Sequence, residues 1–286
     1  MNKPTQSPVT PEDEPVHLSK EETDALNRHG VFFKKRVLQE LQSIHGIGIV
    51  SEELGVSFGG TRVIDIVAAD HRSKPQLFFA VECKRAYAAE KSWIFLRDFD
   101  RHYRVERELG GMVGCSSIFA QSVPPGPPIC SEGYEYRKEK NVADQDPLFK
   151  AAGQLSAGYL GFMARREREV RSFGHNAATT ERYVPVLVTT AELRVLRSDP
   201  STICLESGNA LKEPETQSVN FLILKHPFPT PEGVEPDFRD FPNPIAPPRF
   251  WSQLHKESIY VVRSTALRDF LSEENRNALR SAKSED

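Results

Sequence analysis

The sequence predicts an α/β fold with a mixed central sheet flanked by helices, and three stretches carry this prediction. Between residues 19 and 44, apolar side chains recur near the 3.6-residue period of a helix. Residues 62–69 and 76–84 are apolar runs joined by a short polar linker, which is typical of a hairpin. A second helical pattern at 147–170 precedes the apolar run 183–188, which we expect to form a buried strand.

The composition excludes several classes of protein. The chain has 286 residues, enough for a sizeable core, and a net charge of −3, which gives no global attraction to nucleic acid. Its longest apolar runs are far shorter than the ~20 residues that cross a bilayer, and no secretory signal is visible, so we expect a cytoplasmic protein without membrane contacts. The four cysteines lack the spacing of a zinc site.

The N-terminal part divides into a leader and the start of a core. Residues 1–18 contain several prolines and acidic residues, and we expect a flexible leader followed by a core at 19–190. Ser19 and Glu22 have the spacing of a capping box, which predicts a helix start. Gly30 should weaken this helix or split it in two.

The rest of the chain is expected to add an insertion and an extension. We predict that residues 86–146 form an insertion, helical at 90–109 and irregular at 110–146. The C-terminal part, 191–286, should extend the same sheet. Its expected elements are strands at 192–196, 219–224 and 258–262 and a short helix at 265–280.

Three polar residues interrupt the apolar hairpin runs. Asp65 lies inside the β-branched run Val-Ile-Asp-Ile-Val, where a buried carboxylate is costly unless it is paired. Glu82 and Lys84 end the second run and are two residues apart, so they share one face of a strand. Antiparallel pairing about the linker places Asp65 opposite Glu82, and the three side chains should converge.

This arrangement is suited to a divalent metal ion. Two adjacent carboxylates repel each other unless a cation lies between them, and hard oxygen ligands favour Mg²⁺ or Mn²⁺. Asp65 and Glu82 would be ligands, with the backbone carbonyl of Cys83 as a further candidate. Lys84 could hold or activate a water molecule, so the pattern favours hydrolysis of a phosphodiester.

The order helix, strand, strand with Asp65, strand with Glu82-x-Lys84, helix, strand resembles the PD-(D/E)XK superfamily of restriction-endonuclease-like nucleases. The resemblance covers residues 30–85 and 147–190. It implies an αβββαβ core in which Asp65 and Glu82 bind Mg²⁺ or Mn²⁺ and Lys84 serves the attacking water.

The resemblance also suggests accessory residues, and it has two departures. Acidic residues on the first helix often join the metal shell, which makes Glu40 a candidate ligand, and Gln154 and Tyr159 are similar to a Gln and a Tyr on the helix after the third strand. Ile64 stands where the Pro of the motif's name would be, and the insertion before the second helix is long.

Arginines at 97, 101 and 104 follow helical spacing and could contact a phosphate backbone, or could be a solvated face balanced by neighbouring acidic residues. Each candidate has a plain alternative. Asp65 and Lys84 could form a structural salt bridge, Glu40 and Gln154 could be surface residues, and Tyr159 could be a core aromatic.

The preferred functional hypothesis is a metal-dependent nuclease, an endonuclease or an exonuclease, acting on DNA first and RNA second, with a homodimer possible. Two other functions fit the same sequence. One is a catalytically inactive nucleic-acid-binding module with this fold, and the other is a protein-interaction scaffold that uses the Pro-rich stretches.

Overall fold

The computed structural model describes residues 18–28, 30–57, 61–72, 76–86, 92–97, 127–137, 142–144, 146–172, 181–197, 203–207, 209–210, 213–225 and 258–281. The predicted leader up to residue 17, two of the candidate nucleic-acid-binding residues, Arg101 and Arg104, and the Pro-rich stretch 227–250 lie outside these residues.

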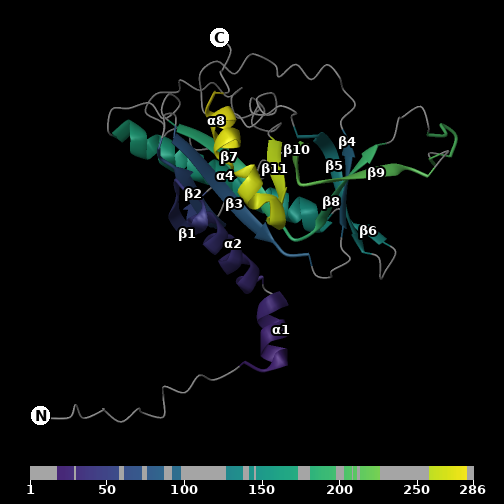
Figure 1. Cartoon of the computed structure of the whole chain (residues 1–286), viewed down its shortest axis with the longest axis horizontal. Helices are drawn as coiled ribbons and strands as arrows, with labels where there is room; N and C mark the ends of the chain where they lie inside the picture. The colour runs from purple at the N-terminus through teal and green to yellow at the C-terminus, as the bar shows by residue number, and fades with distance from the viewer. Residues whose placement is uncertain are drawn as a thin grey trace, which may run out of the picture.

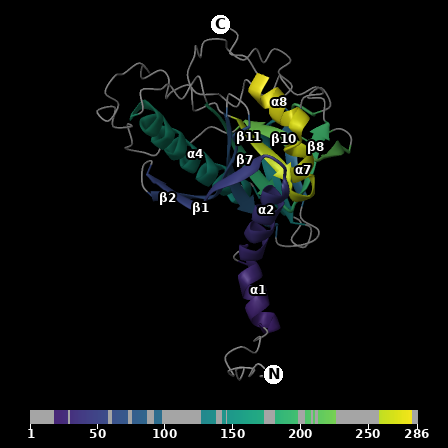
Figure 2. The same cartoon turned by 60° about the vertical axis from the view of Figure 1, so that its left-hand side comes forward.

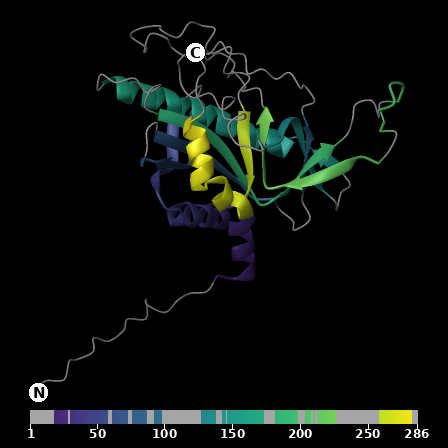
Figure 3. The same ribbon diagram turned by 45° about the horizontal axis from the view of Figure 1, so that its top comes forward.

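The predicted N-terminal helix is confirmed and is split as Gly30 suggested. Helix α1 spans Lys20–Arg28 and α2 spans Val31–Ser43, and Gly30 between them has φ 72°. The capping box is formed: the Glu22 amide donates to Ser19 Oγ at 3.1 Å, and the Ser19 amide donates to Glu22 Oε2 at 2.8 Å. Helix α2 packs on the sheet, whereas α1 projects away from it in all three views (Figures 1, 2 and 3).

The predicted strands and hairpin of the core are also confirmed. Strands β1 (Ile47–Ser57), β2 (Thr61–Asp70) and β3 (Gln76–Lys84) are neighbours, and each pairs antiparallel with the next. The register of β1 on β2 shifts by one residue between Ile49 and Ser51, which is a β-bulge.

Two expectations for the insertion are wrong. Residues 92–97 form strand β4 (Ser92–Arg97) and not part of a helix, and the stretch expected to be irregular contains β5 (Ile129–Arg137) and β6 (Val142–Asp144). Trp93 and Phe95, two residues apart, are both buried, so the strand period decides the structure here over the spacing of the arginines.

The second half of the core and the C-terminal extension follow the prediction with two exceptions: the strand expected at 219–224 and the helix expected at 265–280 are each divided. Helix α4 spans Asp146–Ser172 and is followed by β7 (Glu181–Thr189) and β8 (Glu192–Arg197). The single strand expected at 219–224 is instead two, β9 (Glu215–Val219) and β10 (Phe221–Lys225), separated by Asn220. Strand β11 (Ser258–Arg263), a short 3-10 turn (Ser264–Ala266), α7 (Leu267–Phe270) and α8 (Glu273–Ser281) end the described chain.

The described strands form one mixed sheet in the order β1-β2-β3-β7-β11-β10-β5-β4-β8-β9, with β6 paired to β5. Strand β3 runs parallel to β7, and β7 runs parallel to β11. Helix α4 lies along one face of this sheet, and α2, α7 and α8 lie on the other (Figures 1 and 3). The predicted class, an α/β fold with a mixed sheet between helices, is therefore confirmed.

Apolar side chains fill both faces of the sheet. Phe78, Trp93 and Tyr159 belong to the cluster under α4, and Leu41 and Phe79 belong to the cluster under α2 and α8. Helix α4 approaches β2 closely at Gly158, where a Cβ atom would lie 2.8 Å from Cγ1 of Ile64. This contact fixes how α4 is rotated on the sheet.

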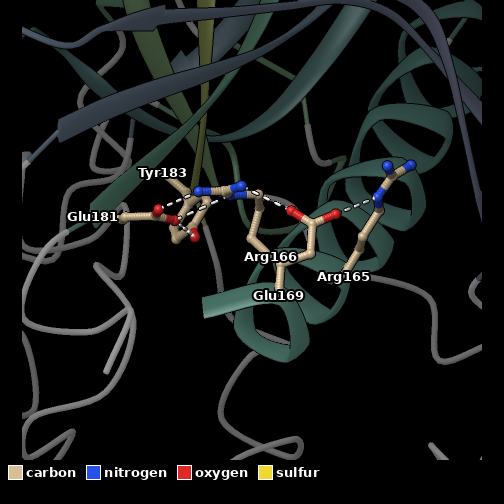
Figure 4. A network of polar contacts seen from close by, with 5 residues as sticks. All are labelled: Arg165, Arg166, Glu169, Glu181 and Tyr183. Atoms are coloured by element: carbon tan, nitrogen blue, oxygen red, sulfur yellow. Dashed lines mark hydrogen bonds and ion pairs between the residues drawn. The ribbon is translucent and has the colours of Figure 1, made fainter. Parts of the chain in front are cut away.

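Polar networks join α4 and α8 to one end of the sheet. Figure 4 shows Arg166 of α4 between Glu169 and Glu181, with Arg165 donating to Glu169 and the Tyr183 hydroxyl donating to Glu181. At the same end, where Gln76 pairs with Glu181, buried Asp70 is contacted by Arg72 at 3.2 Å and by Arg276 of α8 at 3.3 Å.

Among the helices that the structure describes, none has both the length and the apolar character needed to cross a membrane.

Candidate functional site

Strands β2 and β3 separate at Asp65, and this fork is where the candidate site lies. Their ladder runs from Asp70–Leu77 to Ile66–Val81, so the next positions along it are Asp65 and Glu82. The Cys83 amide donates a hydrogen bond of 2.9 Å to Oδ2 of Asp65, which joins the two strands just beyond their last pair. The hairpin thus brings Asp65 beside Glu82, the placement that antiparallel folding of the two runs predicts.

Glu82 and Lys84 lie on a strand that pairs with β2 only as far as Val81 but with β7 along its whole length. Strand β3 pairs with β7 over its whole length, from Gln76–Glu181 to Lys84–Thr189. Val81 packs in the cluster under α2, and Cys83 packs against the same cluster, so the pleat directs Glu82 and Lys84 to the α4 face. Both side chains are half-buried, and their backbone is paired with β7.

The two carboxylates are poorly neutralised by their surroundings. Burial, and then the charge of Asp65, raises the pKa of Glu82 to about 8, against the smaller effects of Lys84 and Lys34. Burial also raises the pKa of Asp65, although the Cys83 amide and the charge of Lys34 oppose it. Two adjacent carboxyl groups with raised pKa values form a site at which bound positive charge is favourable.

Lys84 is near both acids without being tied to either. Its charge lowers the pKa of Asp65 and of Glu82. Within the described part of the chain, no hydrogen bond or ion pair engages its ammonium group. The lysine can therefore donate to a water molecule or to an oxygen of a bound substrate. The alternative reading of Asp65 and Lys84 as a cross-strand salt bridge is not supported.

Two further charged residues lie at the fork, and the sequence analysis missed both. Glu53 of β1 is opposite Asp65, because its neighbours pair as Glu52–Ile66 and Leu54–Ile64. Lys34 of α2 forms an ion pair with Glu53, and its charge acts on the pKa values of Asp65 and Glu82. The sequence contains two adjacent lysines, Lys34 and Lys35, in the first helical stretch and two adjacent acidic residues, Glu52 and Glu53, in the strand that follows. These two pairs are the signal that could have pointed to the contact.

The backbone at Glu53 is unusual. Its φ is 51°, in the left-handed region that L-residues other than Asn and Asp seldom occupy, and it lies inside a strand. Successive residues of a regular strand point to opposite faces, yet Glu52 and Glu53 both reach α2, where they pair with Lys35 and Lys34. An exposed ion pair contributes little stability, less than such a conformation usually costs. Strained backbone of this kind is concentrated at functional sites.

Glu40, expected as an accessory metal ligand, is engaged elsewhere. Its carboxylate accepts from Arg268 of α7 at 2.7 Å and from Arg36 at 3.1 Å. Helix α2 is rotated so that Glu40 faces α7, while Lys34 faces the fork. This prediction is corrected: two guanidinium groups already neutralise Glu40, and it serves to join α2 to α7.

The structure does not bring Tyr159 or Arg97 to the fork. Gln154 is exposed on α4 one turn before Gly158, which packs on Ile64 beside Asp65, so its assisting role stays a prediction. Tyr159 is fully buried and its hydroxyl donates to the Tyr183 carbonyl at 3.4 Å, so it is a core residue and cannot contact nucleic acid. Arg97 is exposed at the end of β4 and is not on a helix.

The donor set at the fork fits a hard cation with few protein ligands. Among the residues described, no three His, Cys, Asp or Glu side chains gather as a metal-binding group. Asp65 and Glu82 would supply two carboxylates, and Mg²⁺ characteristically binds through one or two carboxylates, water and substrate phosphate. The Cys83 thiol packs toward the α2 side and its pKa is raised by burial, so a thiolate ligand is disfavoured, and only its carbonyl remains a candidate.

Comparison of the chain with models of protein families, with curated proteins and with solved structures finds no match. Any functional conclusion therefore has to come from the residues at the fork.

Proposed function

We propose that this chain is a metal-dependent nuclease that hydrolyses phosphodiester bonds, with DNA as the first substrate class and RNA as the second. The observation that carries the proposal is the meeting of Asp65, Glu82 and Lys84 where β2 and β3 separate. The raised pKa values of the two acids support it, because they indicate a site that lacks positive charge.

The arrangement of the core supports a restriction-endonuclease-like fold. Helix α2, strands β1, β2 and β3, helix α4 and strand β7 follow one another in the chain, interrupted by β4 to β6. The first three strands are antiparallel neighbours, and β7 joins β3 in parallel. This order of elements agrees with the αβββαβ order that the resemblance implies, and α2 and α4 lie on opposite faces of the sheet, which supports the proposed fold.

A bound Mg²⁺ or Mn²⁺ would be held by Asp65 and Glu82, and it would supply Lewis acidity toward a phosphate oxygen and lower the pKa of a bound water. The protein's own residues have distinct tasks. The Cys83 amide fixes one oxygen of Asp65, which leaves the other for a ligand. Lys84 orients the attacking water and stabilises negative charge that develops on the phosphate.

The test is a cleavage assay with purified full-length protein. Circular and linear duplex DNA, single-stranded DNA and RNA are incubated with Mg²⁺, Mn²⁺ or EDTA. Wild type is compared with Glu82→Gln and Lys84→Ala, and Lys35→Ala serves as a control because its partner Glu52 is exposed. We expect metal-dependent cutting that falls by at least about a hundredfold in both site variants and is unchanged in the control.

Cutting that persists in Glu82→Gln would contradict the proposed centre. Metal-independent binding of nucleic acid without cutting would instead favour the inactive binding module. Cleavage of circular DNA would establish endonuclease action.

A further inference from the structure

Lys34 reaches the fork from a different element than the three residues of the proposed centre. It lies on α2, on the sheet face opposite α4, and its side chain is only 18% exposed. Its charge lowers the pKa of both Asp65 and Glu82, and it also acts on Cys83 between them. Its ion-pair partner Glu53 is opposite Asp65 in the β1–β2 pairing, so the ammonium group approaches the fork from the α2 side, whereas Lys84 lies on the α4 side.

Glu53 holds this ammonium group through one oxygen. Within the described residues, the Oε1 atom of Glu53 is the hydrogen-bond partner of Lys34 Nζ. A lysine ammonium has three donors, so two remain for another acceptor. The neighbouring pair, Lys35 with Glu52, already ties α2 to β1 without an unusual backbone. The left-handed conformation of Glu53 is thus not needed to attach the helix, and it accompanies the ion pair of Glu53 with Lys34 at the position opposite Asp65.

The acceptor that suits this position is a phosphate oxygen. Asp65 and Glu82 each carry the influence of the other or of Glu53 as well as that of the two ammonium groups, Lys34 and Lys84, although the three acids do not gather as one metal-binding group among the described residues. A nucleic acid strand adds further negative charge, and a second lysine beside Lys84 offsets it. Lysine serves in phosphate sites as a mobile point charge with several donors.

We propose that Lys34 is a substrate-binding residue that donates to a phosphate oxygen of a DNA strand lying at the Asp65–Glu82 site, with Glu53 positioning its ammonium group. This inference rests on the proposed nuclease function. It assigns to α2 one contact with the strand and to Glu53 a positioning role.

The test measures DNA binding separately from cutting. Affinity for a labelled duplex is followed by fluorescence anisotropy in EDTA across a series of KCl concentrations. The variants are Lys34→Met, Lys34→Arg and the double variant Lys34→Met/Glu53→Gln, which keeps the net charge of the pair. The matched control is Lys35→Met, one residue away on the same helix with an exposed partner.

If Lys34 contacts phosphate, its loss weakens binding by about threefold to tenfold and reduces the slope of log K against log salt by about 0.9. The double variant should show the same loss of slope, because the direct contact is still missing. Lys34→Arg should retain most of the slope, and Lys35→Met should match wild type. Thermal unfolding of each variant checks that the fold is intact.

An unchanged slope in Lys34→Met overturns the inference, and so does a double variant that recovers the wild-type slope, since the effect would then be one of net charge. Failure of the inference is distinguishable from failure of the function. If wild type cuts DNA and Glu82→Gln does not, a wild-type slope in Lys34→Met refutes only the phosphate contact proposed for Lys34 and leaves the nuclease function standing. If wild type cuts no nucleic acid, the proposed function fails and this inference fails with it.

Discussion

Replacing Glu82 with glutamine should stabilise the metal-free protein at alkaline pH, although it should abolish cleavage. Burial, and then the charge of Asp65, raises the pKa of Glu82 from the ordinary 4.5 to about 8. Between these values the folded protein holds a proton on Glu82 that the unfolded chain has released. Glutamine resembles the protonated side chain in shape and cannot ionise.

The direction of the pH dependence follows from this difference. Because the folded state binds more protons, the contribution of Glu82 to stability is fully present below pH 4.5, falls as pH rises, and is lost above about pH 8. At about 1.4 kcal/mol for each pKa unit, the change is on the order of 5 kcal/mol at most, since water reaches a half-buried carboxylate. We expect Glu82→Gln to be more stable than wild type by about 2–4 kcal/mol at pH 9 and nearly equal to it at pH 5.

The assay is urea unfolding in EDTA at pH 5, 7 and 9, followed by circular dichroism. Glu213→Gln, which changes an exposed glutamate, is the control and should follow wild type at every pH. The reasoning is refuted if Glu82→Gln is less stable than wild type at pH 9. It is also refuted if the difference between the two proteins is the same at pH 5 and pH 9.

Two further predictions concern metal binding and the backbone. Mg²⁺ at about 100 times its dissociation constant should add about 2.7 kcal/mol of stability to wild type at pH 8. Calorimetric unfolding should show no such gain in Glu82→Gln, and an equal gain would exclude Glu82 as a ligand. Gly46→Ala should lose about 1–3 kcal/mol in urea unfolding. Gly46 has φ 83°, and the added Cβ would lie 2.0 Å from Nε of Arg72, which pairs with Asp70. Gly48→Ala, where the added Cβ meets no atom within 4 Å, should change stability far less.

The hairpin could be predicted from the sequence because its signals are local. Asp65 and the Glu82–Lys84 pair interrupt two apolar runs, and the alternation of side chains along strands does not depend on the rest of the fold. The hydrogen bond from the Cys83 amide to Asp65 then follows from the register of the pair. The class of the fold was predictable for the same reason, since it needs only the order of helices and strands.

The contributions of Glu53 and Lys34 could not be predicted, and the choice between a core and a nucleic-acid-binding role for Tyr159 stayed open, because these depend on irregular backbone and on packing. A one-residue bulge and a positive φ place Glu53 opposite Asp65, and neither has a signature in its neighbours. The rotation of α4 is set where Gly158 meets Ile64, and this turns Tyr159 into the core. Helical periodicity identifies a buried face but does not identify the atoms that it meets.

The two ends of the β2–β3 hairpin differ in how far their buried acidic side chains are neutralised by cationic groups. At the end that carries Asp70, guanidinium groups of Arg72 and Arg276 contact the carboxylate, and α8 is fastened by the same contact. At the fork, Asp65 and Glu82 have raised pKa values; the Cys83 amide donates to Asp65, and the cationic charges that act on the two acids are those of Lys34 and Lys84. Buried acids that stabilise a fold are paired with well-placed cationic donors. Buried acidic side chains that lack cationic partners reduce the stability of the fold. A bound cation would supply the missing positive charge, and a phosphate could then bind to that cation. The stabilising end of the hairpin thus allows the fork to keep a charge arrangement that is unfavourable until a ligand is bound.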